Sequence, residues 1–111
     1  MKVIVSHEGA VTMVKPMGPA VSGELEELGS ELQNLSCNWA KRIIVNMSEV
    51  NYIDSAGLEL FSYYASEFKN HGLQLKLSSL NEITQKIFDI TRLSRRFEIF
   101  SDTSTAVRSY L

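Results

Sequence analysis

Few features of the sequence point to an oxidising compartment or to a membrane. Cys37 is the only cysteine among 111 residues, so an intrachain disulfide is excluded and a reducing environment is favoured. No apolar stretch approaches the roughly 20 residues that a helix needs to span a bilayer. Charged side chains occur too early in residues 1–8 for a signal peptide. We therefore expect a cytoplasmic protein with no membrane insertion.

Positive charge is also scarce. The formal net charge is −2, and no predicted face combines basic with aromatic side chains, which makes nucleic acid an unfavourable partner. The one basic cluster in the sequence consists of Arg92, Arg95 and Arg96. Clusters of this kind are most often solvated surface, and the alternative is contact with an acidic patch on a protein partner.

Motifs of catalysis and metal binding are missing as well. The sequence has no phosphate-binding loop of the Walker type, no Gly-x-Ser-x-Gly elbow and no zinc-like Cys/His spacing. His7 and His71 are far apart in sequence. Cys37 has no redox or nucleophile motif around it, so we expect a partly buried structural thiol. We expect no cofactor, no metal and no enzymatic activity.

What the sequence does contain is the composition of an ordinary globular domain. Hydrophobic residues make up 44% and charged residues 22%, whereas a disordered chain would have fewer apolar residues and a larger net charge. There is no internal repeat, low-complexity segment or linker. Because a chain of this length has room for one hydrophobic core, we interpret residues 1–111 as a single domain.

Strands are predicted in both halves of the chain. Residues 3–6 and 10–15 are short β-branched runs that flank a glycine, which predicts a hairpin, and Pro16 should end its second strand. Residues 43–45 form a continuous apolar run, typical of a central strand covered on both faces, with Trp39 expected to pack near its start. Later in the chain, two further segments read as strands: residues 73–77, with one drier face, and residues 97–100.

Four helices are predicted between and after these strands. The first carries leucines at three- and four-residue spacing: Leu25, Leu28, Leu32 and Leu35. The second covers residues 55–69, and Ser79 with Glu82 has capping-box spacing ahead of the third. Ser101 or Asp102 should cap the last. The order β-β-α-β-α-β-α-β-α predicts an α/β domain with a mixed sheet of about five strands packed with about four helices.

The segment between the central strand and the second helix is the most informative. Small and polar residues from Asp54 to Gly57 expose free N–H groups at the helix start, and such a terminus favours an anion. A phosphate on Ser55 could be held there without disturbing the fold, with roughly 0.3–1 kcal/mol contributed by the helix dipole. The alternative is plain capping, with Gly57 allowing close packing of the helix on the sheet. The phosphoacceptor interpretation requires an accessible Ser55 hydroxyl, within one residue of the N-cap.

Asp54-Ser55-Ala56-Gly57-Leu58 resembles the Asp-Ser-(Ser/Ala/Thr)-Gly-Leu signature of the STAS domain family, which includes bacterial anti-sigma-factor antagonists. The resemblance covers nearly the whole chain, since it extends to the element order and to four further segments, residues 43–45, 50–53, 87–88 and 97–100. It therefore implies the STAS fold, a mixed sheet packed with helices.

The resemblance also implies a partner-switching cycle. In the family, the serine that matches Ser55 is phosphorylated by a serine kinase that also acts as an anti-sigma factor. The unphosphorylated protein binds this kinase and frees the sigma factor, the phosphorylated form dissociates, and a phosphatase resets the cycle. Phosphate brings about −1.5 to −2 charges into a surface that must be desolvated on binding. A penalty near 3 kcal/mol would weaken association by roughly a hundredfold.

The implied partner-binding surface combines the motif with the loop before the first helix. It comprises Asp54, Ser55, Ala56, Gly57, Leu58, Glu59, Gly18, Val21 and Ser22. Glu59 reads either as a favourable charge near the helix start or as a group that tunes the switch. Val21 and Asn46 stand where relatives commonly carry aspartate, although an alignment shifted to Glu26 would restore an acid. These departures concern recognition by a particular kinase rather than the fold.

A second interpretation keeps the fold and changes the role. Some STAS domains resemble accessory subunits of transport systems or parts of stress-signalling scaffolds, and use similar surfaces as fixed docking sites. A docking subunit without sigma-factor regulation is therefore the alternative function. The two functions differ in whether binding depends on the phosphorylation state of Ser55.

Overall fold

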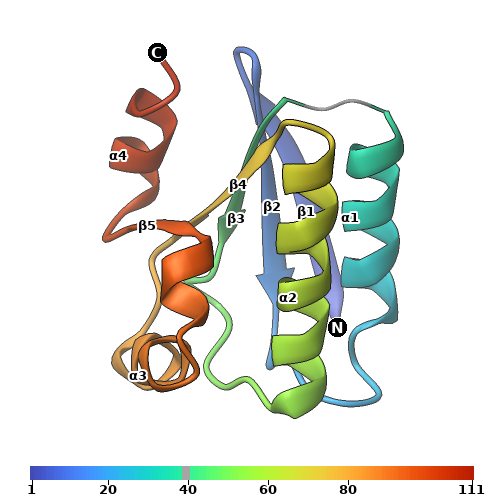
Figure 1. The fold of residues 1–111 in the computed structure, drawn as a ribbon, viewed down its shortest axis with the longest axis vertical. Coiled ribbons are helices and arrows are strands. Elements are labelled where there is room, and N and C mark those ends of the chain that lie inside the picture. The colour runs from blue at the N-terminus through green and yellow to red at the C-terminus, as the bar shows by residue number, and fades with distance from the viewer. Residues whose placement is uncertain (39–40) are drawn as a thin grey trace.

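The computed structural model describes residues 1–38 and 41–111, which form one five-stranded sheet with helices on both faces (Figure 1). The strands are β1 (Lys2–Glu8), β2 (Val11–Met17), β3 (Arg42–Asn46), β4 (Gln74–Ser78) and β5 (Glu98–Phe100). The helices are α1 (Glu26–Cys37), α2 (Ser55–Asn70), α3 (Glu82–Ile90) and α4 (Thr103–Arg108), and a 3-10 turn, η1 (Leu93–Arg96), precedes β5. Trp39, which we expected near the start of β3, lies outside the described residues.

The strands lie side by side in the order of the chain, from β1 to β5. β1 is antiparallel to β2, with Val5 opposite Val14, and the other neighbouring pairs are parallel, with Ile43 opposite Leu75. An antiparallel pair can be joined by a tight turn, whereas each parallel pair needs a crossover. The crossovers contain α1, α2 and α3 in turn. This topology confirms the predicted mixed sheet of five strands with four helices.

The central strand β3 is covered on both faces, as its continuous apolar run predicts. Ile43 and Val45 belong to the larger hydrophobic core, on the side of α1 and α2. Ile44 points the other way and packs with Val11 and with Ala106 of α4. This alternation follows from strand geometry, in which successive side chains face opposite sides of the sheet. Figure 1 shows the resulting layers, with α1 and α2 together on one face and α4 on the other.

Three phenylalanines join α2 to the C-terminal part of the chain. Phe61 of α2 lies 5.9 Å from Phe88 of α3 and 6.3 Å from Phe97 just before β5, measured between ring centroids. All three side chains are buried. Aromatic pairs in such edge-to-face arrangements contribute about 0.5–1.5 kcal/mol beyond the burial of their area. The cluster therefore fixes α3 and η1 against α2.

We expected β4 to have one drier face, formed by its leucines, with Lys76 on the more solvated face. The structure differs from this expectation at Lys76. Its side chain is buried because α4 covers this face. The ammonium group donates a hydrogen bond to Ser109 Oγ at 2.7 Å, lies 3.3 Å from the Glu98 carboxylate and lies 3.9 Å from the centre of the Tyr110 ring. The Tyr110 hydroxyl donates to the Ile43 carbonyl at 2.9 Å, and burial raises its pKa to about 12. This network attaches α4 to the sheet.

Pro16 and Ser79 have structural roles that differ from those that the sequence predicts. Pro16 lies inside β2 rather than after it. Because β2 pairs with β3 only over residues 12–14, the missing N–H of Pro16 falls where the strand has one neighbour in the sheet. The cap of α3 is Asn81, whose Oδ1 accepts the Thr84 N–H at 2.7 Å. Ser79 has instead a left-handed backbone, with φ of 61°. Asp102 caps α4 as one of the two predicted residues.

Two side chains also occupy environments that we did not expect. Cys37 is exposed rather than partly buried, because α1 buries the row Leu28, Leu32 and Ser36 and Cys37 lies about 100° around the helix from that row. Arg96 is not simply solvated, since its guanidinium donates hydrogen bonds to the hydroxyls of Ser62 and Ser66 on α2. The basic cluster therefore includes one residue that attaches η1 to α2.

We predict that Lys76→Ala lowers the free energy of unfolding by about 2 kcal/mol, because it removes a charge-assisted hydrogen bond and the cation–π contact that hold α4. Lys76→Met, which keeps most of the aliphatic length, should lose about half as much. Urea denaturation followed by circular dichroism measures both changes. The control is Lys86→Ala, which removes an exposed pair with Glu82 at 3.8 Å and should cost at most about 0.5 kcal/mol. Equal losses from Lys76→Ala and Lys86→Ala would contradict the role of Lys76.

Candidate functional site

The start of α2 is held by the carboxylate of Asp54. One oxygen, Oδ1, accepts the Gly57 N–H at 3.1 Å, which is the usual N-cap bond. The other, Oδ2, accepts the Ser22 N–H at 2.9 Å from the segment between β2 and α1. These backbone donors, Ser22 first and then Gly57, lower the pKa of Asp54. The ionised carboxylate therefore joins two segments that are more than 30 residues apart in sequence.

Backbone hydrogen bonds bring the same two segments together. The Ala20 N–H donates to the Tyr52 carbonyl at 2.9 Å, and the Asp54 N–H donates to the Ala20 carbonyl at 3.2 Å. Ala20 and Ile53 thus form a short parallel bridge outside the main sheet. The loop that follows β2 is fixed beside the start of α2 by the backbone and by Asp54 together.

Gly57 makes this close approach sterically feasible. It is buried, and a Cβ atom added to it would lie 2.2 Å from the Ala20 carbonyl oxygen and 2.6 Å from Ile53 Cγ1. Neither distance is compatible with a real side chain, and the first involves backbone that cannot rotate away. Gly57 therefore allows close packing of α2, as expected, but its neighbours are Ala20 and Ile53 outside the main sheet rather than the sheet itself.

Ser55 is the first residue of α2 and is exposed. Within the described part of the chain its hydroxyl forms no hydrogen bond, since the capping bond belongs to Asp54. Ser55 therefore lies within one residue of the N-cap and is accessible, as the phosphoacceptor interpretation requires. Glu59, four residues further on, is also exposed and lies on the same side of the helix. Ala56 and Leu58 are half-buried, and Leu58 packs against the core.

The remaining predicted site residues lie in the loop after β2, at different distances from the motif. Ser22 is exposed and bound to Asp54, and the half-buried Val21 precedes it, with its carbonyl accepting the Glu24 N–H at 2.9 Å. Gly18 is nearer the N-terminus, where an added Cβ would lie 3.7 Å from Met1 Cβ. The structure thus joins Ser22 directly to the motif and leaves Gly18 at the margin.

Sequence reasoning missed three residues of this region. Ala20 supplies the backbone that meets both Gly57 and Asp54, and a lone alanine carries no signal in sequence. Tyr52 is half-exposed beside the motif, and the Asn81 amide donates to the neighbouring Asn51 carbonyl at 3.2 Å, which brings the start of α3 to this loop. Asn46 stands where relatives commonly carry aspartate. Its Oδ1 accepts the N–H of Ser48, two residues further along the chain, at 3.0 Å.

Residues 1–38 and 41–111 contain neither a candidate metal-binding cluster nor a candidate membrane-spanning helix. Within these ranges, no three His, Cys, Asp or Glu side chains gather so that they could hold a metal ion. None of the helices in the same ranges combines the length and the apolar character needed to cross a membrane.

The mixed sheet, its helical crossovers and the capped start of α2 define the chain as an α/β domain. A family model of the STAS domain matches residues 2–106, so the chain belongs to the STAS domain family, as the motif at residues 54–58 predicts.

Solved structures with similar folds include proteins of different roles. A Thermotoga maritima protein described as a candidate anti-sigma factor antagonist has a TM-score of 0.89 and 18% identity, over 96% of this chain and 92% of that chain. The Bacillus cell fate determinant SpoIIAA in its phosphorylated form has a TM-score of 0.78 and 14% identity, over 99% and 100%. A sulfate transporter family protein from Wolinella succinogenes has a TM-score of 0.76 and 16% identity, over 92% and 85%. These similarities establish the fold.

We predict that Gly57→Ala destabilises the protein by about 3 kcal/mol, because the new Cβ would overlap the Ala20 carbonyl and force α2 away from the loop. Gly29→Ala is a matched control in α1, where an added Cβ would meet only Leu60 Cδ1 at 3.5 Å. That change should stabilise the protein by about 0.5 kcal/mol through helix propensity. Thermal and urea denaturation measure both variants. A Gly57→Ala variant as stable as the wild type would show that the close approach is not required.

Proposed function

We propose that this protein is an anti-sigma-factor antagonist that acts in the cytoplasm by partner switching. Its unphosphorylated form binds an anti-sigma serine kinase, phosphorylation of Ser55 releases that kinase, and a phosphatase restores the binding form. The chain itself takes no catalytic role and needs no cofactor. The observation that carries the proposal is the exposed Ser55, whose hydroxyl forms no hydrogen bond within residues 1–38 and 41–111, beside an aspartate that already caps α2.

The division of roles between Asp54 and Ser55 suits a switch that acts on binding rather than on folding. Because the cap and the loop contact depend on Asp54, a phosphate on Ser55 would displace no hydrogen bond of the described structure. The phosphate would lie near the positive end of the helix dipole, where a negative charge is favourable. We therefore propose that the phosphorylated protein keeps its fold.

The effect of the phosphate would fall on the partner. It adds about −1.5 to −2 charges to a surface that already carries the carboxylates of Asp54 and Glu59. A partner that covers this surface must desolvate the added charge or meet it with a like charge, and both raise the free energy of the complex. Ser22 and Val21, held beside Asp54 in the loop after β2, would extend the same contact surface, with Ala56 and Leu58 beneath it.

SpoIIAA gives support from outside this chain. That protein has been solved in both its unphosphorylated and its phosphorylated form, and the two structures match this fold with TM-scores of 0.75 and 0.78. A STAS fold can therefore carry a phosphate and remain a STAS fold. We propose the same behaviour here.

A second candidate is a docking subunit of a transport system or signalling scaffold without sigma-factor regulation. The similarity to a sulfate transporter family protein favours it. In that case the surface around Ser55 would bind its partner irrespective of charge at residue 55. The two candidates therefore give opposite results in a single binding comparison.

The test starts with capture from a lysate of the source cells by wild-type, Ser55→Ala and Ser55→Asp baits, followed by identification of a captured ATP-binding serine kinase and its purification. Isothermal titration then measures its affinity for each bait. We predict similar affinity for the wild type and Ser55→Ala, and roughly a hundredfold weaker binding for Ser55→Asp and for the Ser55-phosphorylated protein.

Ser30→Asp provides the matched control, because Ser30 is an exposed helical serine on α1 and receives the same charge change away from the motif. It should bind the kinase like the wild type. Equal affinity of all Ser55 variants for the captured partner, or a transporter component captured by all of them, would contradict partner switching and favour the docking subunit.

A further inference from the structure

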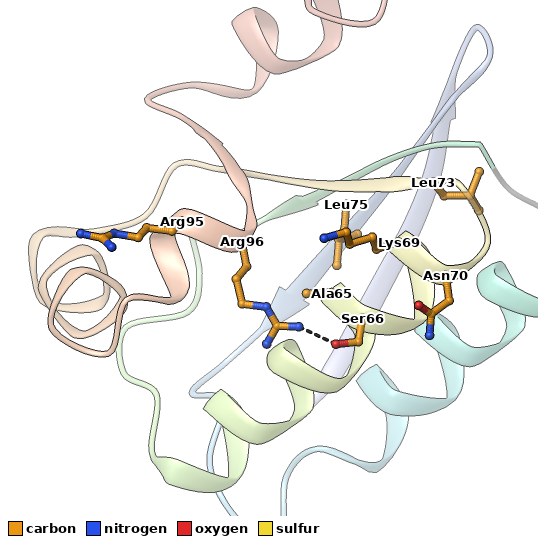
Figure 2. A pocket seen from close by; sticks show the side chains of 8 residues that line it. All are labelled: Ala65, Ser66, Lys69, Asn70, Leu73, Leu75, Arg95 and Arg96. Carbon is orange, nitrogen blue, oxygen red and sulfur yellow. Dashed lines mark hydrogen bonds between the residues drawn. The ribbon is translucent and has the colours of Figure 1, made fainter.

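A pocket of about 630 Å³ lies at the opposite end of α2 from Ser55 (Figure 2). It is bordered by the last turns of α2, by the segment that enters β4 and by η1. Its lining includes Ser66, Lys69, Leu73, Leu75, Arg95 and Arg96. Lys69 follows Ser55 by 14 positions on the same helix, so the pocket lies about 21 Å from Ser55 along the helix axis.

The pocket exists because the sheet is incomplete at this point. β5 pairs with β4 only from Lys76 onward, so the earlier part of β4 has β3 on one side and no strand on the other. Leu73 and Leu75 thus border a space that neither β5 nor η1 fills. The result is a hollow with an apolar floor at the edge of the sheet.

The charge of the lining is one-sided. Three basic side chains border the pocket, and no acidic side chain appears among the described lining residues. None of Lys69, Arg95 and Arg96 forms an ion pair within the described part of the chain. This local excess contrasts with the net charge of −2 for the whole protein.

Arg96 is held in place by neutral partners. Its guanidinium donates to the hydroxyls of Ser62 and Ser66, which orient the group without neutralising its charge. Figure 2 shows the Lys69 side chain extending across the pocket toward the Arg96 side, whereas Arg95 points away. Each serine hydroxyl that accepts from Arg96 still has its own proton to donate. Lys69, Arg96 and Ser66 therefore contribute two positive charges and a hydroxyl donor to the lining of one pocket.

We propose that this pocket binds a small, soluble phosphate monoester that carries a compact apolar group. A phosphate monoester brings about −1.5 to −2 charges and three acceptor oxygens at neutral pH, which matches the two cations and the Ser66 hydroxyl. The apolar group would pack against Leu73 and Leu75. The volume is in the range of small-molecule sites.

The surroundings favour a soluble ligand over a membrane lipid. The large exposed hydrophobic side chains of the described structure, such as Tyr63, Ile83 and Ile90, are not among the residues that line the pocket. A lipid surface would need apolar or further basic contacts around the headgroup site. The pocket instead combines one polar corner with an apolar floor, as a site for a single small molecule does.

The test is a titration of the ¹⁵N-labelled chain of residues 1–111 with phenyl phosphate, inorganic phosphate and benzoate, followed by two-dimensional NMR. We predict saturable shifts for phenyl phosphate, centred on Ser66, Lys69, Leu73 and Leu75, with a dissociation constant of roughly 1 mM or below. Inorganic phosphate, without the apolar group, and benzoate, with a single charge, should each bind at least about fivefold more weakly.

Lys69→Gln is the decisive variant, because Lys69 is exposed and its replacement leaves the core intact. It should weaken phenyl phosphate binding about tenfold or more. Lys86→Gln on α3 removes one positive charge elsewhere and should bind like the wild type. Ser55→Ala should also bind like the wild type, which separates this site from the proposed phosphoacceptor.

Three results would overturn the proposal: no saturable shift with phenyl phosphate at roughly 10 mM, equal binding by Lys69→Gln and the wild type, or shifts centred on the start of α2. None of them bears on the switch at Ser55. Conversely, a Ser55 that does not control kinase binding would leave the pocket proposal intact.

Discussion

Gly57 packs against the carbonyl oxygen of Ala20 so closely that no side chain fits between them. This contact sets where α2 begins relative to the loop after β2, and the Ala20–Ile53 bridge and the two bonds of Asp54 are formed in the same place. Since α2 also carries Phe61, Tyr64 and Phe68 of the core, the packing of one face of the sheet depends on this approach.

The same close approach explains why the residues of the motif at positions 54–58 have different structural roles. Asp54 accepts hydrogen bonds from the helix start and from the loop, and Gly57 permits the contact. Leu58 packs against the core and Ala56 is half-buried. Ser55 is left exposed at the end of a rigid element, where a change of its charge need not alter any of these contacts. A partner can recognise the charge at a site of this kind without any rearrangement of the fold.

Much of the fold was predictable because local signals agree with tertiary packing. Residues 43–45 read as a strand covered on both faces, and α2 began where the capping aspartate and the motif predicted. Lys76 was not predictable, since alternation with leucines gives no sign that α4 will cover it. The partnership of Ala20 with Gly57 and the pocket beside Arg96 depend on contacts between distant segments, which the sequence pattern does not encode.

The central claim is that Ser55 can carry a phosphate while Asp54 and Gly57 keep the structure in place. Amide hydrogen exchange of the unphosphorylated and the Ser55-phosphorylated protein tests it most directly. We predict unchanged protection throughout the sheet and the rest of α2, with differences confined to the amides around residues 20–22 and 52–59. Loss of protection along α2 or in β2 on phosphorylation would contradict it, because the phosphate would then act by disrupting the fold.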